Sequence, residues 1–278
     1  MPHRIIFVIL FLIKGMSMHS QVFNQYSEMG FFCGESSYQG DLNPGNPFYM
    51  VSLAGGAFYR YNTSQRFSMR FQGTYGQIKA ADENTNVSYQ LIRNLSFRSV
   101  IIEASSIMEF NFFPYETGNP NCIATPYLFA GLGGFFFDPH ANIDDEWIAL
   151  RPLGTEGQGL TEYPNRKKYS RAQICVPFGM GLKMNAGKKI SFSLEWGIRK
   201  TFTDYLDDVS TTYVDPDILI ANHGAYSALL ADRSTLNPGR SNIGYQRGNK
   251  NNRDWYSILG LSVCFRLSSI KQKCDAYR

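Results

Sequence analysis

The segment ISFSLEWGIRKTF, residues 190–202, decides the fold class. Apolar side chains stand at every second position, namely Ile190, Phe192, Leu194, Trp196 and Ile198. The positions between them hold Ser191, Ser193, Glu195, Gly197 and Arg199. A period of two predicts a β-strand with one apolar and one polar face. In a soluble sheet the apolar face would meet a protein core, whereas in an outer-membrane barrel it would meet lipid and the polar face would line the interior.

Seven other segments of the chain alternate in the same way. They are residues 26–37, 48–62, 66–78, 99–113, 125–137, 171–185 and 255–267. Each is long enough for a tilted strand to cross an outer membrane, which takes about 9–11 residues. The total of eight strands is even, as single-chain bacterial barrels require.

The connections between these segments alternate in length along the whole chain. Short connections are predicted at 63–65, 114–124 and 186–189, and long ones at 39–47, 79–98, 138–170 and 203–254. Outer-membrane barrels have short periplasmic turns and long outer loops. The sequence therefore predicts an all-β protein, an eight-stranded antiparallel transmembrane β-barrel with short periplasmic turns, long outer loops and both termini periplasmic. The predicted location is the outer membrane of a Gram-negative bacterium.

Composition agrees with one large β domain and excludes several other classes. The chain has 278 residues, of which 18% are charged and 15% aromatic, with a formal net charge of +4. This weak charge, without a long basic run, gives no case for nucleic acid as a partner. Mean hydropathy is −0.25, which excludes a helical membrane bundle but is compatible with a barrel.

Three regions follow from the charge and hydropathy pattern. Residues 1–20, with an apolar run at 5–13, are predicted to be a signal peptide, because that run is too short to span a bilayer as an anchor. Residues 21–267 are predicted to form the outer-membrane barrel domain. Residues 268–278 are predicted to be a periplasmic C-terminal tail.

Ten charged residues share the inward parity of their strands. They are Glu28, Arg60, Arg66, Arg70, Glu103, Glu109, Lys183, Glu195, Arg199 and Arg266. Unpaired, these groups would be intolerable in a dry protein core. An eight-stranded barrel is just wide enough for its own side chains to fill the interior. We therefore predict an ion-pair plug that closes the lumen, so that a conducting pore is not expected.

The sequence predicts no catalytic, cofactor-binding or metal-binding residue, and hence a non-enzymatic protein. The segment DPHANIDDE, residues 138–146, collects Asp138, His140, Asp144, Asp145 and Glu146. Its spacing does not match a calcium loop, and a solvated loop is the favoured interpretation. His140 and His223 both fall in long loops, where no rigid triad is expected.

Two further features concern the surface. The loop cations Arg151, Arg166, Lys167, Lys168 and Arg171 are a candidate site for lipopolysaccharide phosphate, with a solvated loop as the alternative. Of five cysteines, Cys122 in a predicted periplasmic turn and Cys274 in the tail lie on the same side of the membrane. These two thiols are predicted either to form a disulfide with each other or to bond a partner.

The first strand and the loop after it carry a family resemblance. The stretch YSEMGFFCGESSYQGDLNP, residues 26–44, resembles the PorG-like outer-membrane proteins of the type IX secretion system. The matching positions are Glu28, Gly30, Gly40, Asp41, Leu42, Asn43 and Pro44. The resemblance implies a non-enzymatic barrel that docks a periplasmic ring of lipoprotein and associated secretion subunits to the outer membrane, and whose loss blocks export of cargo proteins.

The partner surface is predicted on the periplasmic side, at residues 63–65, 115–121 and 186–189 and the tail 268–278. A barrel that binds a ligand through its outer loops, or transports it through a small pore, is the alternative function. The long segments 138–170 and 203–254 have no assigned role in either case.

Overall fold

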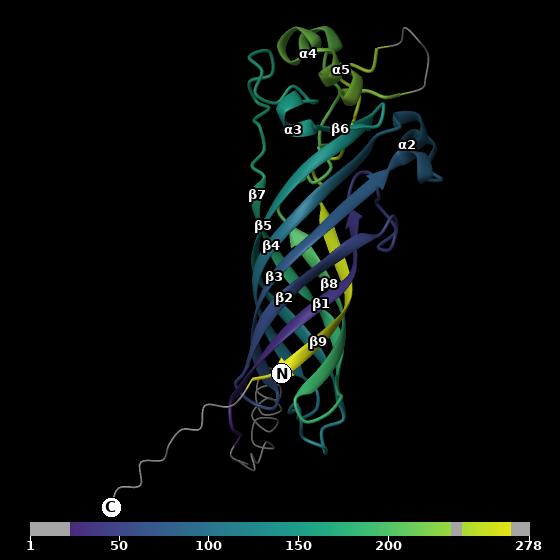
Figure 1. Cartoon of the computed structure of the whole chain (residues 1–278). Coiled ribbons are helices and arrows are strands. Elements are labelled where there is room, and N and C mark those ends of the chain that lie inside the picture. Colours follow the sequence, from purple (N-terminus) through teal and green to yellow (C-terminus); the bar gives the residue numbers. More distant parts are fainter. Residues whose placement is uncertain (1–22, 235–240, 268–278) are drawn as a thin grey trace, which may run out of the picture.

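The computed structural model describes residues 23–234 and 241–267, and it shows a closed β-barrel with its helices gathered at one end (Figure 1). Neighbouring strands pair in the order β4-β3-β2-β1-β9-β8-β7-β5-β6, and an additional β4–β5 pairing closes the cylinder. All pairings are antiparallel. Eight long strands form the wall, and the short β6 pairs only with the outer extension of β5. The predicted eight-stranded antiparallel barrel is confirmed.

The strands lie close to their predicted positions. Their bounds are β1 Tyr26–Gln39, β2 Ser52–Asn62, β3 Phe67–Ala81, β4 Ser96–Asn111, β5 Ala124–Ile143, β6 Glu146–Ala149, β7 Ala172–Asn185, β8 Ile190–Thr201 and β9 Trp255–Arg266. The short helices are η1 Asp82–Asn84, α2 Ser88–Arg93, α3 Leu150–Leu153, α4 Pro216–His223 and α5 Ala225–Ala231. No helix among the described residues is long and apolar enough to cross a membrane.

Side chains alternate between the lumen and the outer wall, as a barrel requires. In β8, Phe192 and Leu194 are exposed on the wall, whereas Ser193 and Arg199 are buried in the lumen. The exposed apolar residues of the other strands include Phe31, Phe71, Ile102, Met108, Leu128, Ile174, Met180 and Leu261. This wall has the polarity expected of a surface in contact with acyl chains.

The two ends of the barrel differ in the way the alternating connections predict. The end where β2 meets β3, β4 meets β5 and β7 meets β8 is called the turn end here, and Tyr26 and Arg266 also lie there. The opposite end, called the loop end, carries the helices of the described residues (Figure 1). A hydrophobic cluster packs the loops against the loop-end parts of the strands, and it includes Tyr38, Phe97, Phe137, Leu206 and Tyr256.

Several predicted boundaries are wrong. The strands β3 and β4 extend to Ala81 and from Ser96 into the connection predicted at 79–98. Two further differences have local reasons. Residues 48–51, predicted to begin the second strand, form a turn, and Met50 has a φ of 49°. Residues 138–143, predicted as loop, continue β5 beyond the wall and fold back into β6. Asp144 and Asp145, with φ of 47° and 66°, make the turn of this hairpin, and aspartate tolerates that region of φ better than most residues.

The predicted signal peptide and C-terminal tail, residues 1–20 and 268–278, lie outside the described residues. Cys274 lies outside them as well. The barrel domain predicted from 21 to 267 contains every described residue of the wall.

Candidate functional site

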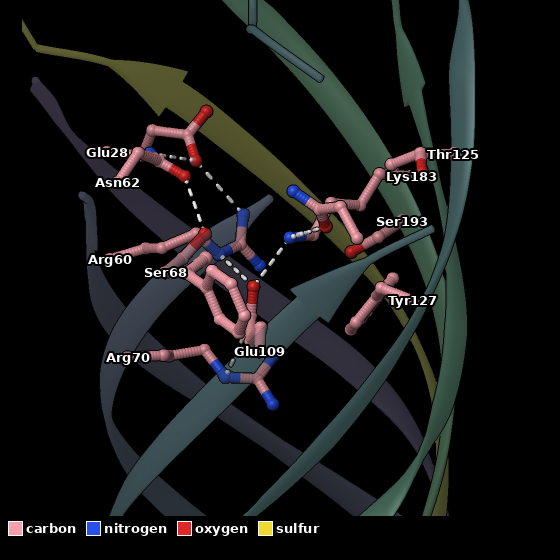
Figure 2. Close-up of polar contacts among 12 residues, drawn as sticks. Glu28, Arg60, Asn62, Ser68, Arg70, Glu109, Thr125, Tyr127, Lys183 and Ser193 are labelled. Atoms are coloured by element: carbon pink, nitrogen blue, oxygen red, sulfur yellow. Dashed lines mark hydrogen bonds and ion pairs between the residues drawn. The ribbon is translucent and has the colours of Figure 1, made fainter. Parts of the chain in front are cut away.

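The lumen is crossed near the turn end by a chain of ion pairs centred on Glu109, which enters the barrel two residues before β4 ends at Asn111 (Figure 2). Its Oε2 lies 2.9 Å from Arg60 Nε and 2.6 Å from Lys183 Nζ, and its Oε1 lies 3.2 Å from Arg70 Nε. Arg60 also contacts Glu28 at 3.1 Å. One carboxylate therefore joins three cations from three other strands, all nearly fully buried. We call this chain, completed by Glu195, the lumen network.

Arg70 extends the lumen network across the barrel to β8. Its Nη1 and Nη2 donate to the two carboxylate oxygens of Glu195, at 2.6 and 3.0 Å, and the Tyr127 hydroxyl donates to the same carboxylate at 2.6 Å. A second pair lies nearer the loop end, where Arg199 Nε donates to Glu103 Oε2 at 3.2 Å. The Tyr256 hydroxyl also donates to Glu103 Oε2.

The charges of these pairs balance, and the space between them is filled. Four carboxylates, Glu28, Glu103, Glu109 and Glu195, face four cations, Arg60, Arg70, Lys183 and Arg199. A cavity of about 20 Å³ between Phe58, Arg70 and Ile258 has room for about one water molecule. The structure thus brings eight of the ten predicted plug residues together inside the barrel.

The other two predicted plug residues lie at the turn end. Arg66 is exposed and donates to the carbonyl oxygen of Phe112 at 2.6 Å, so its predicted place in the lumen is wrong. The reason is that β3 begins one residue later, so the barrel wall does not fix the direction of this side chain. Arg266 is half-buried and pairs with Glu116 at 3.0 Å, outside the lumen network.

The turn between β4 and β5 closes the turn end of the barrel. Tyr115 and Thr117 are buried. The backbone N–H of Thr117 donates to the Tyr26 hydroxyl, and its side-chain Oγ1 donates to Glu28. Asn185 at the end of β7 accepts from the Tyr115 hydroxyl at 3.0 Å and donates to the Glu116 carbonyl oxygen. Sequence reasoning missed this closure, because nothing in the spacing of the turn shows that it folds inward.

Replacing Gly118 with alanine is expected to loosen this closure. Gly118 has a φ of +90°, and an added Cβ would lie 2.1 Å from the Lys188 carbonyl oxygen in the neighbouring turn. We expect a loss of about 1–3 kcal/mol in unfolding free energy, because both the backbone and the neighbour must shift. Urea unfolding in detergent measures this, with Gly45→Ala as the control, since nothing lies within 4 Å of a Cβ there. Equal stability of the two variants would contradict the expected strain.

At the loop end the loops bury a second charged group, which we call the cap network. It contains Asp41, Asp82, Arg93, Glu156, Asp204, Asp207, Asp208, Arg247 and Asp254. Arg93 donates from Nε and Nη2 to Asp82, both at 2.7 Å, and Arg247 donates to Glu156 at 3.0 Å. Seven carboxyl groups therefore stand against two cations, in contrast to the balanced lumen.

Protons held by some of these carboxyl groups reduce the excess negative charge of the cap network. The Tyr38 hydroxyl lies 2.6 Å from Asp207 Oδ2 and 2.8 Å from Asp254 Oδ1. The phenol has one proton and can donate it to one of them, so the other short contact requires a proton on a carboxyl group. Burial raises the pKa of Asp204 to about 7 and the pKa of Asp208 to about 6. Burial, followed by the charge of neighbouring carboxylates, raises the pKa of Asp207 and Asp254 well above the ordinary value.

The residues of the family resemblance support the two networks rather than an open surface. Glu28 belongs to the lumen network, and Gly30 leaves room for the Phe58 ring, since a Cβ there would lie 2.3 Å from it. At the loop end, Gly40 and Asn43 pair through their backbones, and Leu42 is buried in the hydrophobic cluster.

The last two motif residues lie at the edge of the cap network. Asp41 accepts from the backbone of Asn249 at 2.7 Å, and Pro44 is exposed in the turn that follows. The motif therefore helps to hold the segment around Asn249 onto the barrel.

The remaining sequence candidates do not come together. Asp144, Asp145 and Glu146 are exposed on the β5–β6 hairpin, and no group of three or more His, Cys, Asp or Glu residues in the described part of the chain is arranged to hold a metal ion. His140 lies on the outer wall and His223 at the end of α4. These placements give no grouped acid, base and nucleophile.

The loop cations and the thiols are also dispersed. Arg151 and Arg166 donate to backbone carbonyl oxygens within the loops, and Lys167 and Lys168 are exposed. Arg171 lies on the barrel wall. Cys122 forms no disulfide with a described cysteine, and its predicted pairing with Cys274 remains a prediction.

Closed strand pairing, an apolar outer wall and a polar filled interior together describe a small outer-membrane β-barrel protein. Only a closed barrel lets strands satisfy every backbone group within lipid. The location is therefore the bacterial outer membrane.

Comparison with known proteins gives one family match and several structural likenesses. The family described as "Domain of unknown function (DUF6089)" matches residues 3–219. No curated protein matches the chain.

Three solved structures illustrate the likenesses in fold. Neisserial surface protein A is 10% identical, with a TM-score of 0.41 over 87% of this chain and 97% of that one. Ail of Yersinia pestis is 9% identical, with a TM-score of 0.40 over 88% and 100%. The outer-membrane protein OprG of Pseudomonas aeruginosa is 8% identical, with a TM-score of 0.36 over 87% and 96%.

Proposed function

The chain belongs to the DUF6089 family, and we propose that it is a non-enzymatic barrel that anchors a periplasmic ring complex of a type IX protein secretion and gliding machinery to the outer membrane. The turn end, with the first and last strand ends, is the periplasmic side. The partners are the ring lipoprotein and its associated secretion subunits. The proposal takes its partner class from the PorG-like resemblance of residues 26–44.

The observation that carries the proposal is the filled lumen. Balanced ion pairs cross the barrel, and the inward turn of Tyr115 and Thr117 covers the turn end. A barrel without a passage acts through its surfaces, and a rigid interior suits an anchor that bears the load of a complex. The same observation disfavours the alternative of transport through a small pore.

The surface at the turn end combines positive charge with exposed apolar groups. Lys188 and Lys189 are exposed in the β7–β8 turn, and Arg66 lies beside the neighbouring turn. Phe113 is 59% exposed and Ile123 is 76% exposed. Apolar groups surrounded by charged ones suit a protein partner. Within the predicted partner segment 115–121, the side chains of Tyr115 and Thr117 are buried and therefore cannot contact a partner.

Charge reversal at the turn end is expected to release the partner. In cells, the variant Lys188→Glu with Lys189→Glu should lower co-purification of the ring lipoprotein at least about tenfold, because two attractive contacts become repulsive. Cargo export should fall with it.

The matched control reverses the pair Lys167 and Lys168, which is equally exposed but lies at the loop end. This variant should retain both the partner and export. If both variants keep the lipoprotein and export cargo normally, docking at this surface is wrong.

A further inference from the structure

A row of cations crosses the outer wall near the loop end. Strand register places Lys79 of β3 opposite Arg98 of β4, and Arg98 opposite His140 of β5. These residues are far apart in sequence but lie side by side on adjacent strands. Arg171, which immediately precedes β7, joins them, since its guanidinium group lies 5.0 Å from the centre of the Phe136 ring.

Most of the positive charge in this row is not neutralised by an ion pair among the described residues. Arg171 pairs with Asp138 at 3.1 Å, whereas within the described residues Lys79 and Arg98 form no ion pair. Arg98 is held against Trp147, its guanidinium carbon 3.5 Å from the ring centre. A tryptophan beside an arginine at this height is typical of the membrane interface. Three permanent cations against one carboxylate leave a surplus of two positive charges.

Below this row the same strands form an apolar hollow. Gly73, Ala104, Gly134 and Ile174 are successive cross-strand partners on β3, β4, β5 and β7. The hollow measures about 790 Å³, and Phe71, Leu132 and Phe202 form its sides. Small residues at the centre and large ones at the rim make a concave site in the wall.

The distance between the row and the hollow matches a membrane lipid. Six residues separate Gly73 from Lys79, Ala104 from Arg98 and Gly134 from His140, or about 20 Å along the strands at ~3.3 Å per residue. With strands tilted by about 40°, this is roughly 15 Å along the membrane normal, half of the ~30 Å hydrocarbon thickness. A headgroup at the row can thus place an acyl chain in the hollow.

We propose that this wall of β3, β4, β5 and β7 binds the lipid A part of lipopolysaccharide. Lys79, Arg98 and Arg171 take its phosphate groups, and one acyl chain fills the hollow above Ala104. The proposal rests on the orientation given above, in which the loop end faces the outer leaflet. A glycolipid with two phosphates and several chains suits the row better than a phospholipid, because Arg233 adds a further cation beside Ser96 at 3.2 Å.

The test of the charged row uses the full chain in dodecyl maltoside and purified hexa-acylated lipid A, with affinity measured by thermophoresis. Lys79→Ala with Arg98→Ala should weaken binding at least about tenfold, since each cation makes a charge-assisted contact. Lys188→Ala with Lys189→Ala removes the same charge at the turn end and should leave the affinity unchanged. Equal affinity of the two variants would overturn the proposal.

The test of the hollow uses Gly73→Phe with Gly134→Phe. A Cβ meets nothing within 4 Å at Gly73 and only the Gln173 carbonyl oxygen at 3.9 Å at Gly134, so both rings can enter the hollow. This variant should reduce affinity for hexa-acylated lipid A at least about fivefold, while heat-modified migration on a gel shows that the barrel is folded. Unchanged affinity would exclude the hollow as the acyl site.

Two further points distinguish lipid A from other lipids and lipid binding from docking. Phosphatidylglycerol in place of lipid A should bind at least about tenfold more weakly, and equal binding would overturn the assignment to lipopolysaccharide. Lipid A binding in detergent does not require the ring lipoprotein, so this test can fail or succeed independently of docking at the turn end.

Discussion

Glu109→Gln is expected to destabilise the barrel strongly. The carboxylate lies against Arg60, Arg70 and Lys183, and all four side chains are nearly fully buried. Removing one partner of a buried ion pair typically costs about 3–5 kcal/mol, because the other charge stays in a medium that cannot solvate it. Here one substitution leaves three cations short of a partner. We expect a loss of at least about 4 kcal/mol, which is a large fraction of the roughly 5–15 kcal/mol by which native proteins are stable.

Heat-modified gel migration and urea unfolding in detergent measure this loss. Glu116→Gln is the matched control, because it removes the same charge from the half-exposed pair with Arg266 and should cost less than about 1 kcal/mol. Adding Lys183→Met to Glu109→Gln restores the charge balance of the lumen and should recover part of the stability. Similar losses for Glu109→Gln and Glu116→Gln would mean that water solvates the lumen, and the filled interior would be the wrong description.

Strand alternation predicts the barrel because each residue of a strand has only two directions to face. Glu103 and Glu195 could therefore be assigned to the lumen by counting from Ile102 and Trp196. The same counting fails at Arg66, where the strand has not yet begun. It also fails for the β5–β6 hairpin, since the alternation of 138–143 is hidden by its polar side chains.

The cap network and the cationic row could not be predicted from spacing. Asp41 and Asp254 are 213 positions apart in the sequence. Asp254 follows a long connection that has no periodic pattern, so nothing in the sequence indicates that it meets Tyr38. Lys79, Arg98 and His140 become neighbours only through the register of three strands. Sequence reasoning selected Arg171 of this row, but it grouped Arg171 with Arg151, Arg166, Lys167 and Lys168, which lie in the loops and not on the wall. Register, rather than composition, was the missing information.

The cap network is expected to lose stability as pH rises. Its carboxyl groups have raised pKa values when the cap is closed, with Asp208 at about 6 and Asp204 at about 7, against 3.8 in an open chain. The closed cap therefore binds more protons than the open one between pH 4 and 7. Its stability is complete below about pH 4 and falls as the pH rises through 7.

Hydrogen exchange of the backbone amides of residues 206–210, corrected for intrinsic rates, measures this opening. Each proton released on opening should lower protection about tenfold per pH unit, so protection at pH 7 should be at least about 100-fold lower than at pH 5. Asp145→Asn, on the exposed β5–β6 hairpin, should not change this dependence. Protection that stays constant from pH 5 to 7 would show that the cap carboxyls hold no protons.

Asp207→Asn is expected to remove one proton from this dependence and to tighten the cap at neutral pH. Its amide can donate to the Tyr38 hydroxyl oxygen while the phenol donates to Asp254, so both short contacts form without a shared proton. The charged and titratable groups around the pair are Asp41, Asp204, Arg93 and Tyr38. Because the arginine still faces the remaining acids, protection at pH 7 should rise about tenfold. A fall in protection would show instead that Asp207 is ionised and that the cap depends on its charge.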